Sequence, residues 1–227
     1  MENSWSFRID LDLRSSLGRR SYPDAIVLQE DRNLVMAPPG ILDLDAKNDL
    51  DEAYAAARDQ RPLPLGRFLV LRERSGDMPW TYQAVVHDLE FDPSCRPGDV
   101  RRALGGVVRD AEVRGLFHLA IEPLGRWMSR GLTFEEMVEA IDVTILELCS
   151  DLESSIRLTL MLDGLDELEE ASHLLRSKVL RRSSRSFRTV GDDAAMVEVV
   201  DGGTRYHVKY VPGTLGGYLV NRAHLGA

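Results

Sequence analysis

Residues 117–162 read FHLAIEPLGRWMSRGLTFEEMVEAIDVTILELCSDLESSIRLTLML, and they alternate between strand-like and helix-like patterns. Leu116–Ile121 and Ile156–Leu162 are short apolar runs, typical of buried strands. Between them, Thr133-Phe134-Glu135-Glu136 is a capping box, which predicts a helix beginning at that threonine. A further helix is predicted over Leu165–Leu175. The order strand, helix, strand, helix favours a parallel sheet covered on both faces.

The residues before this stretch predict more elements of the same α/β kind. Trp5–Leu13 alternates apolar and polar residues, which is typical of a half-buried strand near a sheet edge. Further strands are predicted at Ala25–Leu28, Asn33–Ala37, Arg67–Arg72 and Tyr82–Leu89, and helices at Asp49–Gln60 and Pro97–Gly115. Residues 1–175 are therefore predicted to form one α/β domain.

The chain changes character after residue 175. Residues 176–227 carry a net charge of +5, against −14 for the rest of the chain, and six basic residues lie between Arg176 and Arg188. Residues 176–188 are therefore predicted to be a basic linker that could bind an acidic partner. The alternative is that this segment is a solvated linker, or that it is attracted electrostatically to the acidic residues 1–175 of the same chain.

The last part of the sequence predicts a small β structure. Ala195–Val200 and Tyr206–Val211 flank Asp201-Gly202-Gly203, which favours a hairpin. Thr214–Val220 would add a third strand. Residues 189–227 are therefore predicted to be a β extension that packs on the main body, since it is too small to be stable alone.

Composition argues against several classes of function. With 28 Lys and Arg against 37 Asp and Glu, the net charge of −9 argues against broad nucleic-acid binding. The apolar stretches fall far short of the roughly 18 residues needed to cross a bilayer, and the first residues lack a secretory pattern. Cys95 and Cys149 form no CxxC pair. We therefore expect a cytoplasmic protein without a membrane association.

The loop between the strand ending at Ile121 and the capping box is the strongest candidate for a binding site. In open α/β sheets, ligands lie beyond the carboxyl ends of strands, where such loops lead into helices. Its backbone amides and the following helix N-terminus could receive a phosphate. The phosphate-loop candidates are Gly125, Arg126, Trp127, Met128, Ser129, Arg130 and Gly131. A plain surface connection, with Trp127 in the core, is the alternative reading.

Residues from about Trp5 to about Leu175 resemble the macro domain family, the ADP-ribose-binding α/β fold. Asp24-Ala25-Ile26-Val27 is similar to the strand that leads into the family's Asn-bearing loop, and Tyr82–His87 to a strand that ends in histidine. Ala120–Pro123 and the loop to Gly131 are similar to its phosphate loop. The resemblance implies a three-layer α/β/α mixed sheet, with the β extension added, and a ligand such as ADP-ribose or a related nucleotide.

The resemblance also points to residues for the adenine and the ribose, and to departures from the family. The candidates are Asp10, Asp12, Gln29 and Pro123. The family's Asn, which supports hydrolysis, falls near Gln29 or Glu30. Ala37-Pro38-Pro39-Gly40 stands near its triple-glycine loop, and Met128 replaces its mid-loop glycine. The resemblance therefore implies binding without turnover, and we assign no catalytic residue.

Two other functions stay open from the sequence. The fold could have lost its nucleotide site and serve as a protein-interaction or scaffold module, with the acidic body and basic segment as partner surfaces. A hydrolase of ADP-ribose esters is the weaker alternative. No HExxH motif and no His/Cys cluster at metal spacing is present, so we expect no metal and no cofactor.

Overall fold

A computed structural model describes residues 5–14, 22–36, 56–72, 79–127, 129–148, 151–182, 187–189, 195–201, 204–210 and 217–222. In chain order its elements are β1 (Trp5–Leu13), β2 (Ala25–Asp31), β3 (Arg67–Arg72), β4 (Trp80–His87), α2 (Pro97–Val113), β5 (His118–Ile121), α3 (Phe134–Leu148), β6 (Ile156–Leu162), α4 (Leu165–Arg182), β7 (Phe187–Thr189), β8 (Ala195–Asp201), β9 (Thr204–Tyr210) and β10 (Gly217–Arg222). Residues 56–58 are also helical.

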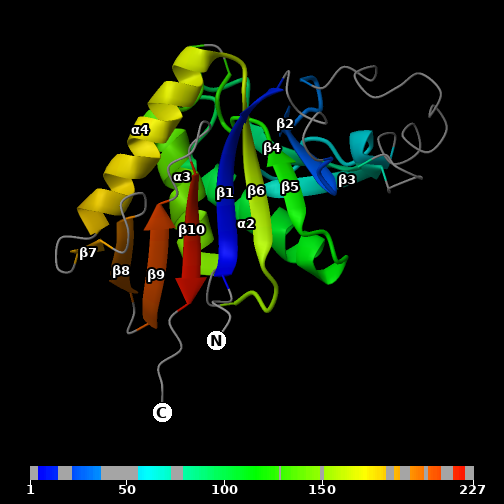
Figure 1. Cartoon of the computed structure of the whole chain (residues 1–227). Helices are drawn as coiled ribbons and strands as arrows, with labels where there is room; N and C mark the ends of the chain where they lie inside the picture. Colours follow the sequence, from blue (N-terminus) through cyan, green and yellow to red (C-terminus); the bar gives the residue numbers. More distant parts are fainter. Residues whose placement is uncertain are drawn as a thin grey trace.

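The described strands form one sheet in the order β3-β4-β2-β5-β6-β1-β10-β9-β8-β7 (Figure 1). Neighbours from β4 to β1 are parallel, as the predicted crossovers require. The pairs β3–β4 and β1–β10, and the pairs beyond β10, are antiparallel. The mixed α/β sheet predicted by the resemblance is therefore confirmed. Its five parallel strands have their carboxyl ends at the edge that carries the candidate loop.

Apolar side chains cover both faces of this sheet. The main core lies under α2 and α3, and Tyr82, Ala84 and Val86 of β4 belong to it. Val85 points to the opposite face, because successive strand residues alternate, and packs with Ala57 of the short helical piece and with neighbouring leucines. Helical residues therefore lie on both faces of β4, as expected for a layered α/β fold.

The C-terminal strands continue the sheet. β10 pairs antiparallel with the outer side of β1, from Trp5 with Asn221 to Asp10 with Gly217. The predicted β extension is therefore joined to the body by backbone hydrogen bonds along a strand edge. Helix α4 runs seven residues past the predicted end at Leu175, to Arg182, and packs against β1, β8 and β10. The side chains of the basic segment 176–188 lie outside the described residues.

Several predicted elements differ from the structure in their bounds, among them those predicted between residues 25 and 60. The strand predicted at Ala25–Leu28 extends to Asp31, and the extended piece predicted from Asn33 to Ala37 is wrong over its described residues. Residues 32–33 form a turn. Asp31 Oδ1 accepts a hydrogen bond from Asn33 N (2.6 Å), and its carbonyl accepts one from Leu34 N (2.9 Å), so Leu34 takes a φ of 59°. Most of the helix predicted at Asp49–Gln60 lies outside the described residues.

None of the helices in the described ranges is long and apolar enough to cross a membrane.

Candidate functional site

The loop from Glu122 to Leu132 joins the carboxyl end of β5 to α3 and folds back on itself. Arg126 N donates to Pro123 O (3.2 Å), and Arg130 N donates to Trp127 O (3.1 Å). Leu132 N then donates to Gly125 O (2.7 Å), which closes the loop at its base. The segment is therefore a compact, internally bonded turn whose two ends lie side by side.

Two glycines make this closure sterically feasible. Gly125 has a φ of +84°, and a Cβ built there would lie 2.9 Å from each of Cys95 Sγ, Val100 Cγ2 and Leu132 Cδ1. A Cβ on Gly131 would lie 2.3 Å from Gly125 O and 2.6 Å from Trp127 N. Contacts this short are not tolerated, so both positions need glycine.

Three described backbone amides of residues 125–131 remain unbonded. Those of Trp127, Ser129 and Gly131 have no hydrogen-bond partner among the residues that the structure describes.

The helix that follows the loop, α3, is capped by its own residues. Thr133 N donates to Glu136 Oε2 (2.9 Å), and Glu136 N donates to Thr133 Oγ1 (3.2 Å). These backbone and side-chain hydrogen bonds to Thr133 lower the pKa of the Glu136 carboxyl. The predicted capping box is therefore confirmed, and the free donors belong to the loop.

The back of the loop is held by Gln29, His87 and Ser94. Gln29 Oε1 accepts from Gly125 N (3.1 Å), and Gln29 Nε2 donates to Arg126 O (2.8 Å). His87 lies between the other two side chains, with Nε2 2.9 Å from Gln29 Oε1 and Nδ1 3.1 Å from Ser94 Oγ. Burial lowers the pKa of His87 to about 4. A neutral, buried hydrogen-bond chain therefore supports the loop from behind.

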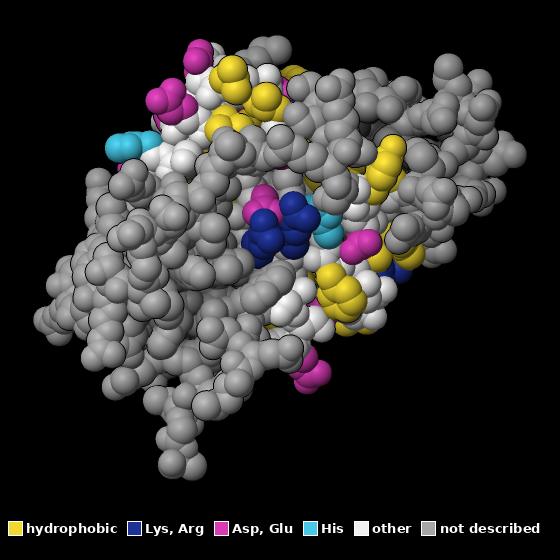
Figure 2. Space-filling view, viewed as in Figure 1, with side chains coloured by type: hydrophobic (Ala, Val, Ile, Leu, Met, Phe, Trp, Pro, Cys, Tyr) yellow, Lys and Arg dark blue, Asp and Glu magenta, His cyan; other side chains and the backbone are white. Residues whose placement is uncertain are grey.

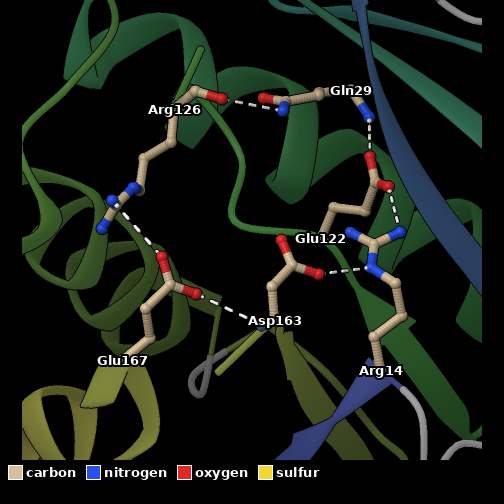
Figure 3. A network of polar contacts seen from close by, with 6 residues as sticks. All are labelled: Arg14, Gln29, Glu122, Arg126, Asp163 and Glu167. Atoms are coloured by element: carbon tan, nitrogen blue, oxygen red, sulfur yellow. Dashed lines mark hydrogen bonds and ion pairs between the residues drawn. The ribbon is translucent and has the colours of Figure 1, made fainter. Parts of the chain in front are cut away.

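The front of the loop belongs to a ring of polar contacts, the ion-pair network of Arg14, Glu122, Asp163, Glu167 and Arg126 (Figure 3). Arg14 Nη1 donates to Glu122 Oε1 (2.7 Å), and its Nε donates to Asp163 Oδ1 (2.9 Å). Asp163 N donates to Glu167 Oε2 (3.2 Å), and Glu167 Oε1 lies 3.5 Å from Arg126 Nη2. Gln29 completes the ring, because its backbone N donates to Glu122 Oε2 (3.1 Å). The network thus links the carboxyl ends of β1, β2, β5 and β6.

The two arginines predicted to bind phosphate make contacts within the protein. Besides Glu167, Arg126 contacts Phe134, with its guanidinium carbon 4.6 Å from the ring centroid. Arg130 Nη2 donates to Phe91 O (2.8 Å). Trp127 is half-buried, Ser129 is exposed, and Met128 lies outside the described residues. Arg126 Nη1 is buried without a hydrogen-bond partner in the part of the chain that the structure describes, so the loop leaves one guanidinium nitrogen unbonded besides its backbone amides.

The predicted adenine and ribose residues lie in different places. Asp10 lies on the sheet face within β1, where both of its oxygens accept from Arg8 and Arg157. Figure 2 shows basic, acidic and histidine side chains close together near the centre of one face. Asp12 lies closer to the end of β1 and accepts from Leu13 N (2.8 Å). Of these candidates, Gln29 and Pro123 directly contact the phosphate loop.

A cavity of about 510 Å³ adjoins the segment that supports the loop. Leu65, Phe91, Ser94, Cys95 and Arg102 are among the residues that line it. Burial raises the pKa of the Cys95 thiol to about 12, so the thiol is protonated at neutral pH and is a poor nucleophile.

Sequence reasoning did not single out Arg14, Glu122, Asp163 or Ser94 for these contacts. The available signal was their position, since the first three directly follow the strands β1, β5 and β6. Side chains at the carboxyl ends of neighbouring parallel strands meet at one sheet edge. The contact of His87 with Gln29 depends on the pairing of β2 with β4, which the order of strands along the sequence does not reveal.

Comparison with known proteins identifies the architecture. No protein-family model and no curated protein matches the sequence. The macrodomain of Thermus aquaticus DarG is similar in structure, with a TM-score of 0.52 and 20% identity, covering 69% of this chain and 99% of that one. The Oceanobacillus iheyensis macrodomain with MES bound has a TM-score of 0.56 and 11% identity, covering 79% of this chain and 95% of that one.

A mutant of the Oceanobacillus iheyensis macrodomain with ADPR has a TM-score of 0.56 and 10% identity, covering 79% of this chain and 96% of that one. This chain has a macrodomain fold. The resemblance found in the sequence is thereby confirmed at the level of fold, and the macrodomain structures match up to 79% of the chain. At these identities the likeness establishes the architecture, and function has to be argued from the site.

Proposed function

We propose that this macrodomain-like chain binds ADP-ribose or a related nucleotide through residues 125–131 without turning it over. The observation that carries the proposal is the set of unbonded amides of Trp127, Ser129 and Gly131, in a segment where the amides of Gly125, Arg126 and Arg130 are bonded within the protein. Backbone N–H groups that converge in a turn bind phosphate oxygens. Solved macrodomains of the same fold with ADPR or ADP support this choice of ligand.

The loop is suited to bind a ligand because its shape is already fixed. The bond from Leu132 N to Gly125 O and the contacts of Gln29 hold it before any ligand arrives. A pre-formed loop loses less conformational entropy on binding than a mobile one. The diphosphate would then lie against residues 127–131, with the nucleoside toward the ends of β1 and β6, where Asp12 is the adenine candidate.

The absence of turnover is proposed from the residues nearest the family's Asn position. The Gln29 amide is occupied by the loop. Glu30 is fully buried, and its Oε1 accepts from Asp31 N (2.9 Å) and Met36 N (2.7 Å). Both side chains are engaged in bonds within the protein, so we expect neither to position a water against the ligand.

The test is calorimetric titration of the full chain with ADP-ribose, ADP and ribose 5-phosphate. We expect micromolar binding of ADP-ribose that Gly131→Ala weakens at least about tenfold, because the added Cβ would collide with the loop backbone. Gly164→Ala is the matched control, since a Cβ there has no heavy atom within 4 Å. Thermal melts of both variants verify folding.

Two outcomes would contradict the proposal. A folded protein that gives no heat with any of these ligands would favour the scaffold module instead, and the ion-pair network across the strand ends is the observation that supports that alternative. Release of free ADP-ribose from an ADP-ribosylated protein would favour the hydrolase.

Three further predictions accompany this function. Residues 176–188 are proposed to bind an acidic partner. The domain limits 1–175, 176–188 and 189–227 remain a prediction from sequence, with α4 continuing into the second range as far as Arg182. The expected location is cytoplasmic, with no membrane association and no broad nucleic-acid binding.

A further inference from the structure

We propose that Gln29, His87 and Ser94 form a loop brace that sets the position of residues 125–131, and that Gln29 is a positioning residue rather than a ribose contact. The inference rests on the proposed function and deepens it, because it names what holds the ligand-binding amides in place. It also accounts for the glutamine near the position where the family carries asparagine.

The groups that face the Gln29 side chain determine which of its two amide atoms is the oxygen and which is the nitrogen. Gly125 N is a donor, so the atom facing it at 3.1 Å is the amide oxygen. Arg126 O is an acceptor, so the atom facing it at 2.8 Å is the amide nitrogen. One side chain therefore holds two consecutive residues of the loop, and its amide oxygen is fully engaged by Gly125 N and His87 Nε2.

The state of His87 follows from the same assignment. Gln29 Oε1 is an acceptor, so the His87 Nε2 that lies 2.9 Å away carries a hydrogen. Because burial lowers the pKa of this imidazole to about 4, it is neutral at physiological pH and its Nδ1 is an acceptor. His87 is 0% exposed, so water cannot replace these contacts.

Ser94 extends the brace to the other end of the loop. Its backbone N donates to Arg130 O at 2.8 Å. Its hydroxyl lies 3.1 Å from His87 Nδ1 and 3.0 Å from Arg130 O, and because it has one hydrogen and Nδ1 is an acceptor, it donates that hydrogen to Nδ1. Gln29 thus fixes residues 125–126 and Ser94 fixes residue 130, with His87 joining the two. The unbonded amides of 127, 129 and 131 lie between and beside these fixed points.

The length of the Gln29 side chain allows a test between its two possible roles, positioning of the loop and contact with the ribose. Asparagine is one methylene shorter, about 1.5 Å, so from β2 it would not reach both Gly125 N and Arg126 O. If Gln29 positions the loop, Gln29→Asn should weaken ADP-ribose binding about as much as Gln29→Ala. If Gln29 contacts the ribose as the family's Asn does, Gln29→Asn should keep or tighten binding.

The experiment measures ADP-ribose affinity of the full chain by calorimetry for both variants and for Gln83→Asn. Gln83 is the matched control, because it is a buried glutamine on the adjacent strand β4 whose Oε1 has no hydrogen-bond partner in the described part of the chain. We expect a loss of at least about tenfold in both Gln29 variants and less than about threefold in Gln83→Asn. Retained affinity in Gln29→Asn overturns the brace.

A second measurement does not depend on the ligand. Amide hydrogen exchange followed by NMR should show Gly125 N exchanging at least about tenfold faster in Gln29→Asn than in the wild type or in Gln83→Asn. If exchange is faster in Gln29→Asn but the wild type does not bind ADP-ribose, the loop brace is supported and the proposed function is contradicted. If the wild type binds ADP-ribose but exchange is unchanged in Gln29→Asn, the proposed function is supported and the loop brace is contradicted. If Gln29→Asn does not fold, Ser94→Ala, which keeps its backbone bond to Arg130 O, should show the same changes with smaller size.

Discussion

The back and the front of the loop at residues 122–132 are held by different kinds of interaction. At the back, His87 and Ser94 are 0% and 2% exposed, and their bonds are between neutral groups. At the front, the side chains of Arg14 and Asp163 are 44% and 68% exposed, and their bond is an ion pair. Losing a partner in the buried set leaves a polar group unsatisfied, whereas exposed ion pairs contribute little. The shape of the loop is thus fixed mainly from behind, and its front is held by weaker contacts.

The largest effect on stability is expected from Gly125→Ala, which disturbs the buried packing at the back of the loop. The residue combines a φ of +84° with contacts of 2.9 Å for any added Cβ, so we expect a loss of about 4 kcal/mol in the free energy of unfolding. Urea denaturation of this variant beside Gly164→Ala measures the difference. A loss no greater than that of the control would mean that the back of the loop is loosely packed.

Acid should weaken the back of the loop through His87. The pKa of this residue is about 4 in the folded chain and near 6.5 when unfolded, so the unfolded state takes up a proton first as the pH falls. The contribution of His87 to the free energy of unfolding is constant above about pH 6.5 and is lower by about 3 kcal/mol at about pH 4. The free energy of unfolding of wild type and His87→Gln, measured at both ends of this window, should differ in pH dependence by that amount. Parallel curves would show that His87 is not shielded from water.

A smaller effect is expected where the loop enters α3. Thr133→Ala removes the hydroxyl that accepts from Glu136 N and should cost about 1 kcal/mol in thermal or urea unfolding. Thr133→Ser keeps the hydroxyl and serves as the control. A similar loss in both variants would assign the effect to packing of the threonine methyl group instead of the cap.

The smallest effect is expected at the front. Arg14→Gln removes two ion pairs, with Glu122 and Asp163, and should change the free energy of unfolding by no more than about 1 kcal/mol. The difference from wild type should shrink further in about 1 M salt, because exposed charges are screened. A large loss of unfolding free energy that does not depend on salt would show that Arg14 behaves like a buried group. The front and the back of the loop would then not differ in how they are stabilised.

Patterns local in sequence predicted their elements closely. The strands Trp5–Leu13, Arg67–Arg72 and Ile156–Leu162 have the predicted bounds, because alternation and apolar runs record which faces are buried. The capping box is equally local, since its hydrogen bonds join residues three positions apart. The position of the candidate loop followed from the order of strands and helices alone.

Features that depend on distant partners could not be predicted in the same way. Gln29 was a ribose candidate because of its place after a strand, but its contacts with Gly125 and His87 join residues 96 and 58 positions apart. The turn at Leu34 depends on a side-chain cap from Asp31, which competes with the extended pattern of the following residues. The joining of β10 to β1 likewise carries no signal in either strand by itself.

The pairing of β1 with β10 has a consequence for how the chain reaches its final form. Trp5 and Asn221 come from opposite ends of the sequence, yet they are bonded neighbours. Contacts of such long sequence separation form slowly, because a large loop must close before they contribute. During synthesis, β1 emerges first and its outer edge has to wait for β10. We expect β1 to be the strand most exposed to unwanted pairing with other chains until translation has passed residue 222.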